Sequence, residues 1–208
     1  MRLNTFYNGG SSTKSTSLIA AFGKESDVAV NDVVSGGAAQ RFDIGTFALN
    51  SGVLSKTSFR SGVVLRGDSV CTLKSNSKIA RSAKGSCSSA EQRGLMLDLG
   101  SRLQLLPDMQ VDCRDVGFAS HSASSAPLDE DKMFYLMSRG LNREKARRAF
   151  VAGFVSKCLE GVESDNVKEI AISILLDKFD SGKLSGAPAI SMRDLWVAPK
   201  LKGDGVMA

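Results

Sequence analysis

The sequence predicts a mainly β protein that ends in a small helical part. Short stretches in which apolar and polar residues alternate occupy positions 2 to about 120, and turn-forming Gly and Asn residues separate many of them. After Pro127, apolar residues recur every three or four positions. Alternation is typical of a strand with one buried face, and the longer spacing is typical of an amphipathic helix.

Seven segments of the first part have the composition of strands. They are, in chain order, Leu18–Phe22, Val28–Val34, Phe42–Leu49, Val53–Phe59, Val63–Leu65, Val70–Leu73 and Leu95–Leu105. Short strands without an intervening helix predict a sandwich, a barrel or a β-helix. Polar residues inside the strands, as in Ser55–Ser58, favour the β-helix, but the sequence shows no clean internal repeat that would decide among the three.

Three helices are predicted after Pro127. The acidic residues Asp129–Asp131 suit the first turn of a helix because they face the positive end of its dipole, and Gly140 ends this helix. Asn142 can cap the second helix. The apolar stripes of the second and third helices are Ala146, Ala149, Phe150, Gly153, Phe154, Cys158 and Val162, and Val167, Ile170, Ala171, Ile174, Leu175 and Phe179. We therefore predict a β domain at 1–126, a three-helix subdomain at 127–180 and a loose tail at 181–208.

Charge and composition exclude several classes of function. The net charge of +5 is spread over the chain, which does not favour a nucleic-acid-binding protein. No apolar run approaches the roughly 18–20 residues of a membrane span, and the N-terminus has no apolar signal segment, so we expect a cytoplasmic protein without membrane contact. The four cysteines form no C-x-x-C pair, which argues against zinc and disulfides. Nucleophile-elbow, P-loop and dinucleotide motifs are absent, so we expect neither catalysis nor nucleotide binding.

One stretch of the chain carries a more specific signal. Residues Pro107–Val116 lead through Ser120–Ser125 into the segment LDEDKMFYLMSRGL at Leu128–Leu141. This stretch resembles the C-terminal signature of the SufB/SufD family of iron–sulfur cluster assembly scaffold proteins. In that family a strand ends near Asp-Val, a histidine follows, and a helix reads approximately L-D-E-x-x-x-F-Y-L-x-S-R-G-I. The resemblance covers about residues 90–160.

The chain departs from the family in ways that make it a shortened, SufD-like member. Several turns of the family's β-helix and its N-terminal helical region have no counterpart in the sequence. Arg93 stands where SufB-type members have a cysteine, and Ser120 and Ser122 flank His121 where those members have glutamates.

The resemblance implies a fold and a set of partners. The implied fold is a right-handed parallel β-helix followed by a small α-helical subdomain. The implied role is that of a non-catalytic scaffold, which pairs with a SufB-type subunit or with itself and docks SufC, an ABC-type ATPase. The complex would build a transient iron–sulfur cluster. Three alternatives stay open: a partner-binding module without cluster chemistry, a metal-dependent enzyme centred on His121 with Asp112 or Asp115 as ligand, and an unrelated β-solenoid.

Two residues are candidate cluster ligands. His121 is the only histidine of the chain, and an imidazole is a good iron ligand. Cys113 lies eight residues earlier and alternates in phase with Met109 and Val111. A thiolate and an imidazole at neighbouring strand ends would hold iron. The ordinary alternatives are a histidine bonded to the backbone and a thiol in the core.

The partner-binding candidates are Phe134, Tyr135, Arg139 and Gly140, which match the family helix that faces the ATPase. Aromatic residues would anchor this helix in a groove of the partner, with Arg139 as a polar contact. Alternatively, Phe134 packs the helices onto the β part and Arg139 is an ordinary surface charge.

Overall fold

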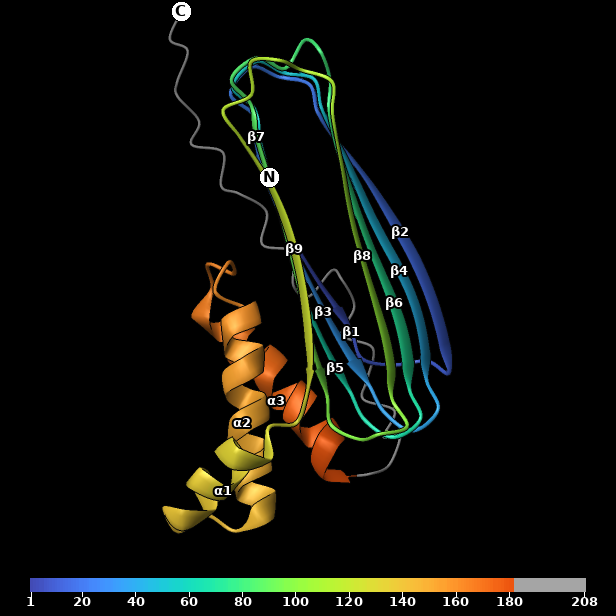
Figure 1. Ribbon diagram of the computed structural model, residues 1–208, viewed down its shortest axis with the longest axis vertical. Helices are drawn as coiled ribbons and strands as arrows, with labels where there is room; N and C mark the ends of the chain where they lie inside the picture. The colour runs from blue at the N-terminus through green and yellow to red at the C-terminus, as the bar shows by residue number, and fades with distance from the viewer. Residues whose placement is uncertain (182–208) are drawn as a thin grey trace, which may run out of the picture.

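Two long β-sheets face each other and are joined by loops at both ends, and three helices lie against one of them (Figure 1). This arrangement comes from a computed structural model, which describes residues 1–181. The tail predicted at 181–208 lies outside the described residues, except for Ser181 at the end of the last helix. The elements are β1 (Arg2–Tyr7), β2 (Ser12–Ala21), β3 (Asp27–Gly36), β4 (Arg41–Asn50), β5 (Lys56–Leu65), β6 (Val70–Ile79), β7 (Cys87–Met96), β8 (Arg102–Val111), β9 (Phe118–Pro127), α1 (Glu130–Ser138), α2 (Arg143–Cys158) and α3 (Asp165–Ser181).

Every strand pairs in parallel within its sheet. The odd-numbered strands form one sheet in the order β1-β3-β5-β7-β9, and the even-numbered strands form the other in the order β2-β4-β6-β8. The chain therefore winds from one sheet to the other and back, and each coil stacks on the coil before it. This is a parallel β-solenoid followed by three helices, so the predicted fold class is confirmed. The parallel pairing decides among the three β folds that the alternation had left open.

The interior of the solenoid is apolar at some levels and polar at others. Ile44, Val63 and Leu73 are almost fully buried in one apolar cluster. At another level the buried Thr46 hydroxyl donates a hydrogen bond of 3.0 Å to Asp32. A longer buried network joins the side chains of Asn50, Thr57, Ser88 and Ser77. Because most of these polar groups are hydrogen-bonded to one another, the strands that carry them need no strict apolar alternation.

Several predicted strand boundaries are wrong. The single strand predicted at Leu95–Leu105 is two strands, since β7 ends at Met96 and β8 begins at Arg102. A turn separates them, in which the Ser101 N–H donates to the carbonyl oxygen of Asp98 across 3.2 Å. Val53 lies in another turn, and β5 begins after it. Strand β9 is absent from the predicted segments, because its Ser- and Ala-rich sequence shows no apolar alternation.

Local capping residues define the helices. The Asp129 side chain caps α1 by accepting a hydrogen bond of 3.1 Å from the Lys132 N–H. Gly140 follows the end of α1 with a φ of 95°, a conformation that suits glycine. Asn142 caps α2 as predicted, and accepts from the Lys145 N–H at 2.8 Å.

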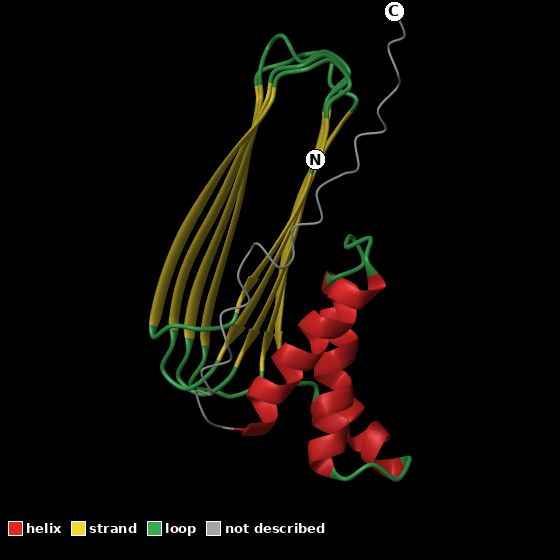
Figure 2. Ribbon diagram, turned by 180° about the vertical axis from the view of Figure 1, so that it is seen from behind, coloured by secondary structure: helices red, strands yellow, loops and turns green. Residues whose placement is uncertain are grey.

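The helices lie against the outer face of the odd-numbered sheet, near the carboxyl ends of its strands (Figure 2). Helix α2 crosses β5 and β3, and the buried side chain of Cys158 lies directly above Gly62. The predicted stripe of α2 is partly wrong. Val151 and Val155 are buried against the sheet, whereas Ala149 and Gly153 are exposed. Contact with the sheet determines which residues of α2 are buried. The spacing of the apolar residues alone did not predict this face correctly. The cluster beneath the helices contains Val33, Val64, Leu95, Leu97, Val151, Val155, Cys158, Leu159, Val162, Ala171, Leu175 and Leu176.

A half-buried lysine attaches α3 to the solenoid. The Lys178 ammonium donates a hydrogen bond of 2.9 Å to the Asn8 carbonyl oxygen and a further hydrogen bond to the Ser35 carbonyl oxygen. It also lies 5.9 Å from the centre of the Phe42 ring. Burial lowers the pKa of Lys178 from 10.5 to about 8, because the charged form loses its hydration. Neutral and charged forms therefore coexist in the folded protein near that pH.

This lowered pKa predicts a pH dependence of stability. Between about pH 8 and 10.5 the unfolded chain binds more protons at this site than the folded chain, so Lys178 makes the free energy of unfolding rise with pH over that window. We expect Lys178→Met, which keeps the apolar stem, to remove this rise. The measurement is chemical denaturation of both proteins from pH 7 to 11. At each pH the free energy of unfolding of the variant is subtracted from that of the wild type, which removes the contributions of the other titrating groups. Parallel curves for the two proteins would contradict the prediction.

Candidate functional site

Strand β9 forms one edge of the odd-numbered sheet, and among the described residues it pairs only with β7. His121 lies opposite Ala90 in this pairing. Ala90 is buried inside the solenoid, so the register places His121 on the inner face of the last coil. His121 is nevertheless exposed, because among residues 1–181 no further coil stacks on β9. The sole histidine of the chain thus stands at the open end of the solenoid.

Cys113 lies in the loop between β8 and β9. It is 8% exposed, packs with Ile79, Ala83 and Val116, and donates a weak hydrogen bond of 3.5 Å from its Sγ to the Asp115 carbonyl oxygen. The thiol therefore sits in a small loop core, whereas His121 stands within β9 at the open coil. Among the described residues no group of three or more His, Cys, Asp or Glu side chains could hold a metal ion.

The acidic residues near this loop have partners of their own. Asp112, a candidate ligand for a metal at His121, forms an ion pair of 3.4 Å with Lys78 and accepts a hydrogen bond of 3.2 Å from Gln110. Asp115 offers its backbone oxygen to the Gly85 N–H at 2.7 Å and to Cys113. The structure therefore does not gather Asp112, Asp115 and His121 into one site.

Helix α1 presents an aromatic pair to solvent. Phe134 is 70% exposed and Tyr135 is 57% exposed. The Arg139 guanidinium lies 5.2 Å from the centre of the Tyr135 ring, within cation–π range. The residue that packs α1 is the neighbouring Met133, which is fully buried. An exposed aromatic pair next to an arginine is typical of a surface that binds a protein partner.

Residues 1–154 match a family described as the SufBD core domain of the SUF system for FeS cluster assembly. The chain belongs to this SufBD family. Among its curated relatives are the iron–sulfur cluster assembly proteins SufD of Plasmodium berghei and of Bacillus subtilis. The former is 33% identical over 95 residues, which make up 46% of this chain and 7% of the relative. The latter is 33% identical over 98 residues, 47% of this chain and 22% of the relative.

A third relative is a SufBD family protein of Mycobacterium leprae, 30% identical over 83 residues, which are 40% of this chain and 21% of the relative. The chain thus spans less than a quarter of the length of each of these relatives.

In this SufBD chain, Arg93 and His121 do not share a face of their sheet. Arg93 alternates with the buried Gln92 on β7 and therefore faces outward. Its Nε donates a hydrogen bond of 2.6 Å to Glu91, whose carboxylate also lies 3.6 Å from Arg60. The position that the resemblance assigned to a SufB-type cysteine thus carries an outward ion pair, while His121 faces the interior.

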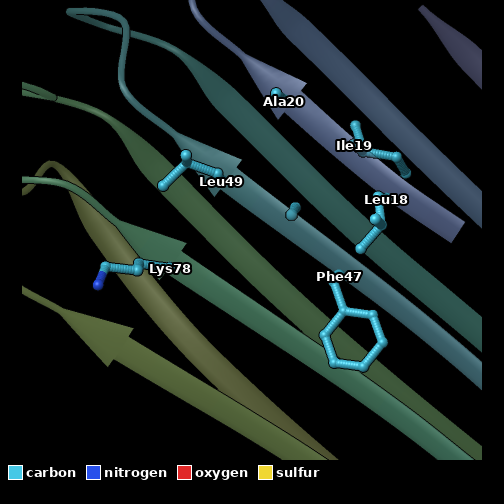
Figure 3. Close-up of a pocket in the computed structure, with 7 residues that line it drawn as sticks. Leu18, Ile19, Ala20, Phe47, Leu49 and Lys78 are labelled. Carbon is cyan, nitrogen blue, oxygen red and sulfur yellow. The ribbon is translucent and has the colours of Figure 1, made fainter.

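A second exposed apolar surface of the SufBD core lies on the even-numbered sheet, at the carboxyl ends of β2 and β4 (Figure 3). There Leu18, Phe47 and Leu49 stand on adjacent strands, and Leu18 is 80% exposed. This surface was not among the sites predicted from the sequence. A signal was present, because Leu18 and Phe47 fall on the otherwise polar outer phase of their strands. Of the helices described, none is long and apolar enough to cross a membrane.

Proposed function

We propose that this chain is a non-catalytic, cytoplasmic scaffold subunit of an iron–sulfur cluster assembly complex. Its open last coil pairs with a SufB-type subunit or with a second copy, and α1 docks a SufC-type ATPase. The observation that supports the proposal is that the open last coil and helix α1 are directly connected in the chain. Strand β9, with His121, leads into the exposed aromatic helix α1 through only Leu128 and Asp129. A partner bound to α1 is therefore connected, through a short segment of chain, to the strand that carries His121.

The open coil has the features of a pairing edge. Strands β8 and β9 each end their sheet, so one side of each backbone lacks a neighbouring strand among the described residues. Unpaired N–H and C=O groups are a template for a strand of another chain. Leu106, Val111 and Phe118, on or beside this coil, are 41%, 44% and 55% exposed. A second subunit stacked on this coil would cover His121 and this apolar surface together.

His121 would then supply one imidazole ligand at the seam between the two subunits. An exposed imidazole binds iron without a large desolvation cost. The remaining ligands would come from the partner, and the iron–sulfur cluster would be cargo that leaves the complex. The nucleotide would be bound by the ATPase and not by this chain.

The docking role predicts that Phe134→Ala/Tyr135→Ala loses the ATPase. Exposed aromatic anchors commonly cost about 2 kcal/mol or more each when truncated in an interface, so the double variant should weaken binding by at least about a hundredfold. The measurement is co-purification and titration of the full chain with a SufC-type ATPase and a SufB-type subunit from the same cell.

The matched control for this experiment is Leu18→Ala, which removes an equally exposed apolar side chain from the even-numbered sheet. It should leave ATPase binding unchanged. If the wild-type chain binds neither partner, the scaffold assignment is wrong.

A second candidate function is a partner-binding module without cluster chemistry. It is favoured by Arg93, whose guanidinium is engaged with Glu91 where SufB-type members carry a cysteine. The metal-dependent enzyme is the third candidate. Stoichiometric metal in the isolated chain after mild purification, lost in His121→Ala, would support it over both binding roles.

A further inference from the structure

A single carboxylate joins the helical part to the loops of the solenoid. Asp98 lies in the loop between β7 and β8, and its Oδ1 accepts a hydrogen bond of 3.0 Å from Arg147 of α2. Its Oδ2 accepts from the Gly67 N–H at 2.8 Å, in the loop of the preceding coil. Arg147 also donates to the Leu97 carbonyl oxygen at 3.4 Å. Asp98 and Arg147 therefore connect two stacked loops to one helix.

Helix α2 is held on the solenoid at two places. Its first half is attached through Arg147, and its end is attached through the close approach of Cys158 to Gly62. Val151 and Val155 are buried between these points. The side chains of Arg147 and Asp98 are 31% and 38% exposed, so this ion pair can open into water without leaving a buried charge. The attachment near Cys158 is apolar and buried, and cannot open in that way.

Helix α1 rests on the half of α2 that Arg147 attaches. Met133 of α1 is fully buried, and Glu130 forms an ion pair of 2.8 Å with Arg143 in the first turn of α2. Lys132 lies 6.0 Å from the centre of the Phe150 ring. The orientation of Phe134 and Tyr135 therefore depends on the orientation of the first half of α2, which in turn depends on its attachment to the solenoid.

We propose that Asp98 and Arg147 are positioning residues that set the angle of α1 relative to the solenoid. Opening this ion pair loosens the coupling between a partner bound on α1 and strand β9, because α1 is then connected to β9 chiefly through Leu128 and Asp129. The inference rests on the proposed ATPase docking. It goes beyond docking because it distinguishes two processes: the partner binds α1, and the partner's movement is then transmitted to β9, the strand that carries His121. The ion pair would carry that movement alongside the direct chain connection through Leu128 and Asp129.

The test uses the full chain with Arg147→Met, which keeps the stem and removes the charge, and Arg147→Lys as the conservative variant. Arg148→Met is the control on the same helix: it removes an ion pair of 3.9 Å with Asp177 of α3 and leaves the Asp98–Arg147 pair in place. Hydrogen exchange is followed in α1, in the first half of α2 and in β5. We expect Arg147→Met to accelerate exchange in α1 and in residues 143–148 while β5 stays protected. Arg147→Lys should restore at least half of the protection, and Arg148→Met should resemble the wild type.

In complex with the ATPase, Arg147→Met should change the dissociation constant less than about threefold but lower the chain's effect on the ATP hydrolysis rate at least about fivefold. Asp98→Asn should do the same, which guards against a folding defect peculiar to one variant. Equal behaviour of Arg147→Met and Arg148→Met would overturn the inference. If the wild-type chain binds no ATPase, the proposed function fails, and unchanged exchange in Arg147→Met would separately refute the positioning role.

Discussion

Replacement of His121 by alanine is expected to lower the cluster yield of the assembled complex at least about tenfold. Residues that merely support a metal ligand cost roughly 10- to 100-fold in affinity when removed, and a direct ligand should cost no less. The imidazole is exposed on an edge strand, so its loss should change the free energy of unfolding by no more than about 0.5 kcal/mol. The measurement is iron and sulfide content after reconstitution of the chain with its SufB-type and ATPase partners.

The control for this experiment is Ser122→Ala, because Ser122 follows His121 on the same exposed strand but faces outward. It should leave both assembly and cluster yield unchanged. A His121→Ala complex that assembles and still accumulates a full complement of cluster would reject the ligand role. The partner-binding module without cluster chemistry would then be the better description of this SufBD chain.

A large effect on stability is expected at Gly62. A Cβ atom at this position would lie 2.4 Å from Sγ and 2.6 Å from Cβ of Cys158. Gly62→Ala therefore forces α2 away from β5 or distorts the strand, and overpacking of this kind costs about 1–3 kcal/mol. For a chain of this size we expect the melting temperature to fall by about 3–10 °C. Thermal unfolding followed by circular dichroism measures the shift.

Two comparisons make this prediction specific. Gly153 lies on the exposed side of α2 with no atom within 4 Å of an added Cβ, so Gly153→Ala should stabilise the protein by about 0.5–1 kcal/mol. Adding Cys158→Gly to Gly62→Ala should recover part of the loss, since it vacates the space that the new methyl group needs. A Gly62→Ala protein as stable as the wild type would show that Cys158 of α2 does not pack closely on Gly62 of β5.

Features that depend on neighbours in the sequence were predictable. Asn142 accepts a hydrogen bond from a backbone N–H three residues later, and Gly140 adopts a positive φ at the end of α1. Both effects involve a few adjacent residues and need no tertiary contact. The resemblance at Leu128–Leu141 was also recognisable in the sequence, and the family match over residues 1–154 agrees with it.

Features that depend on stacked coils were not predictable. Ser88 and Gln92 line the interior of β7, where their polar groups are bonded to Ser77, Thr57 and Ser75 on other strands. A hydrogen bond between residues so far apart in the chain does not produce a periodic pattern of apolar and polar residues, so it cannot be predicted from such a pattern. The same is true of Asp98 and Arg147, which are 49 residues apart and meet only after α2 has folded back onto the loops.

The sequence by itself determined that a β part precedes three helices, that the family signature is present, and that the only histidine lies beside this signature. Only the tertiary structure decided that the strands stack in parallel, that His121 faces the inside of an open coil, and that Phe134 and Tyr135 are exposed while Met133 is buried. The physical reason is that local hydrogen bonds and helix caps are formed within a few residues. The face that a side chain presents depends instead on which distant coil or helix covers it.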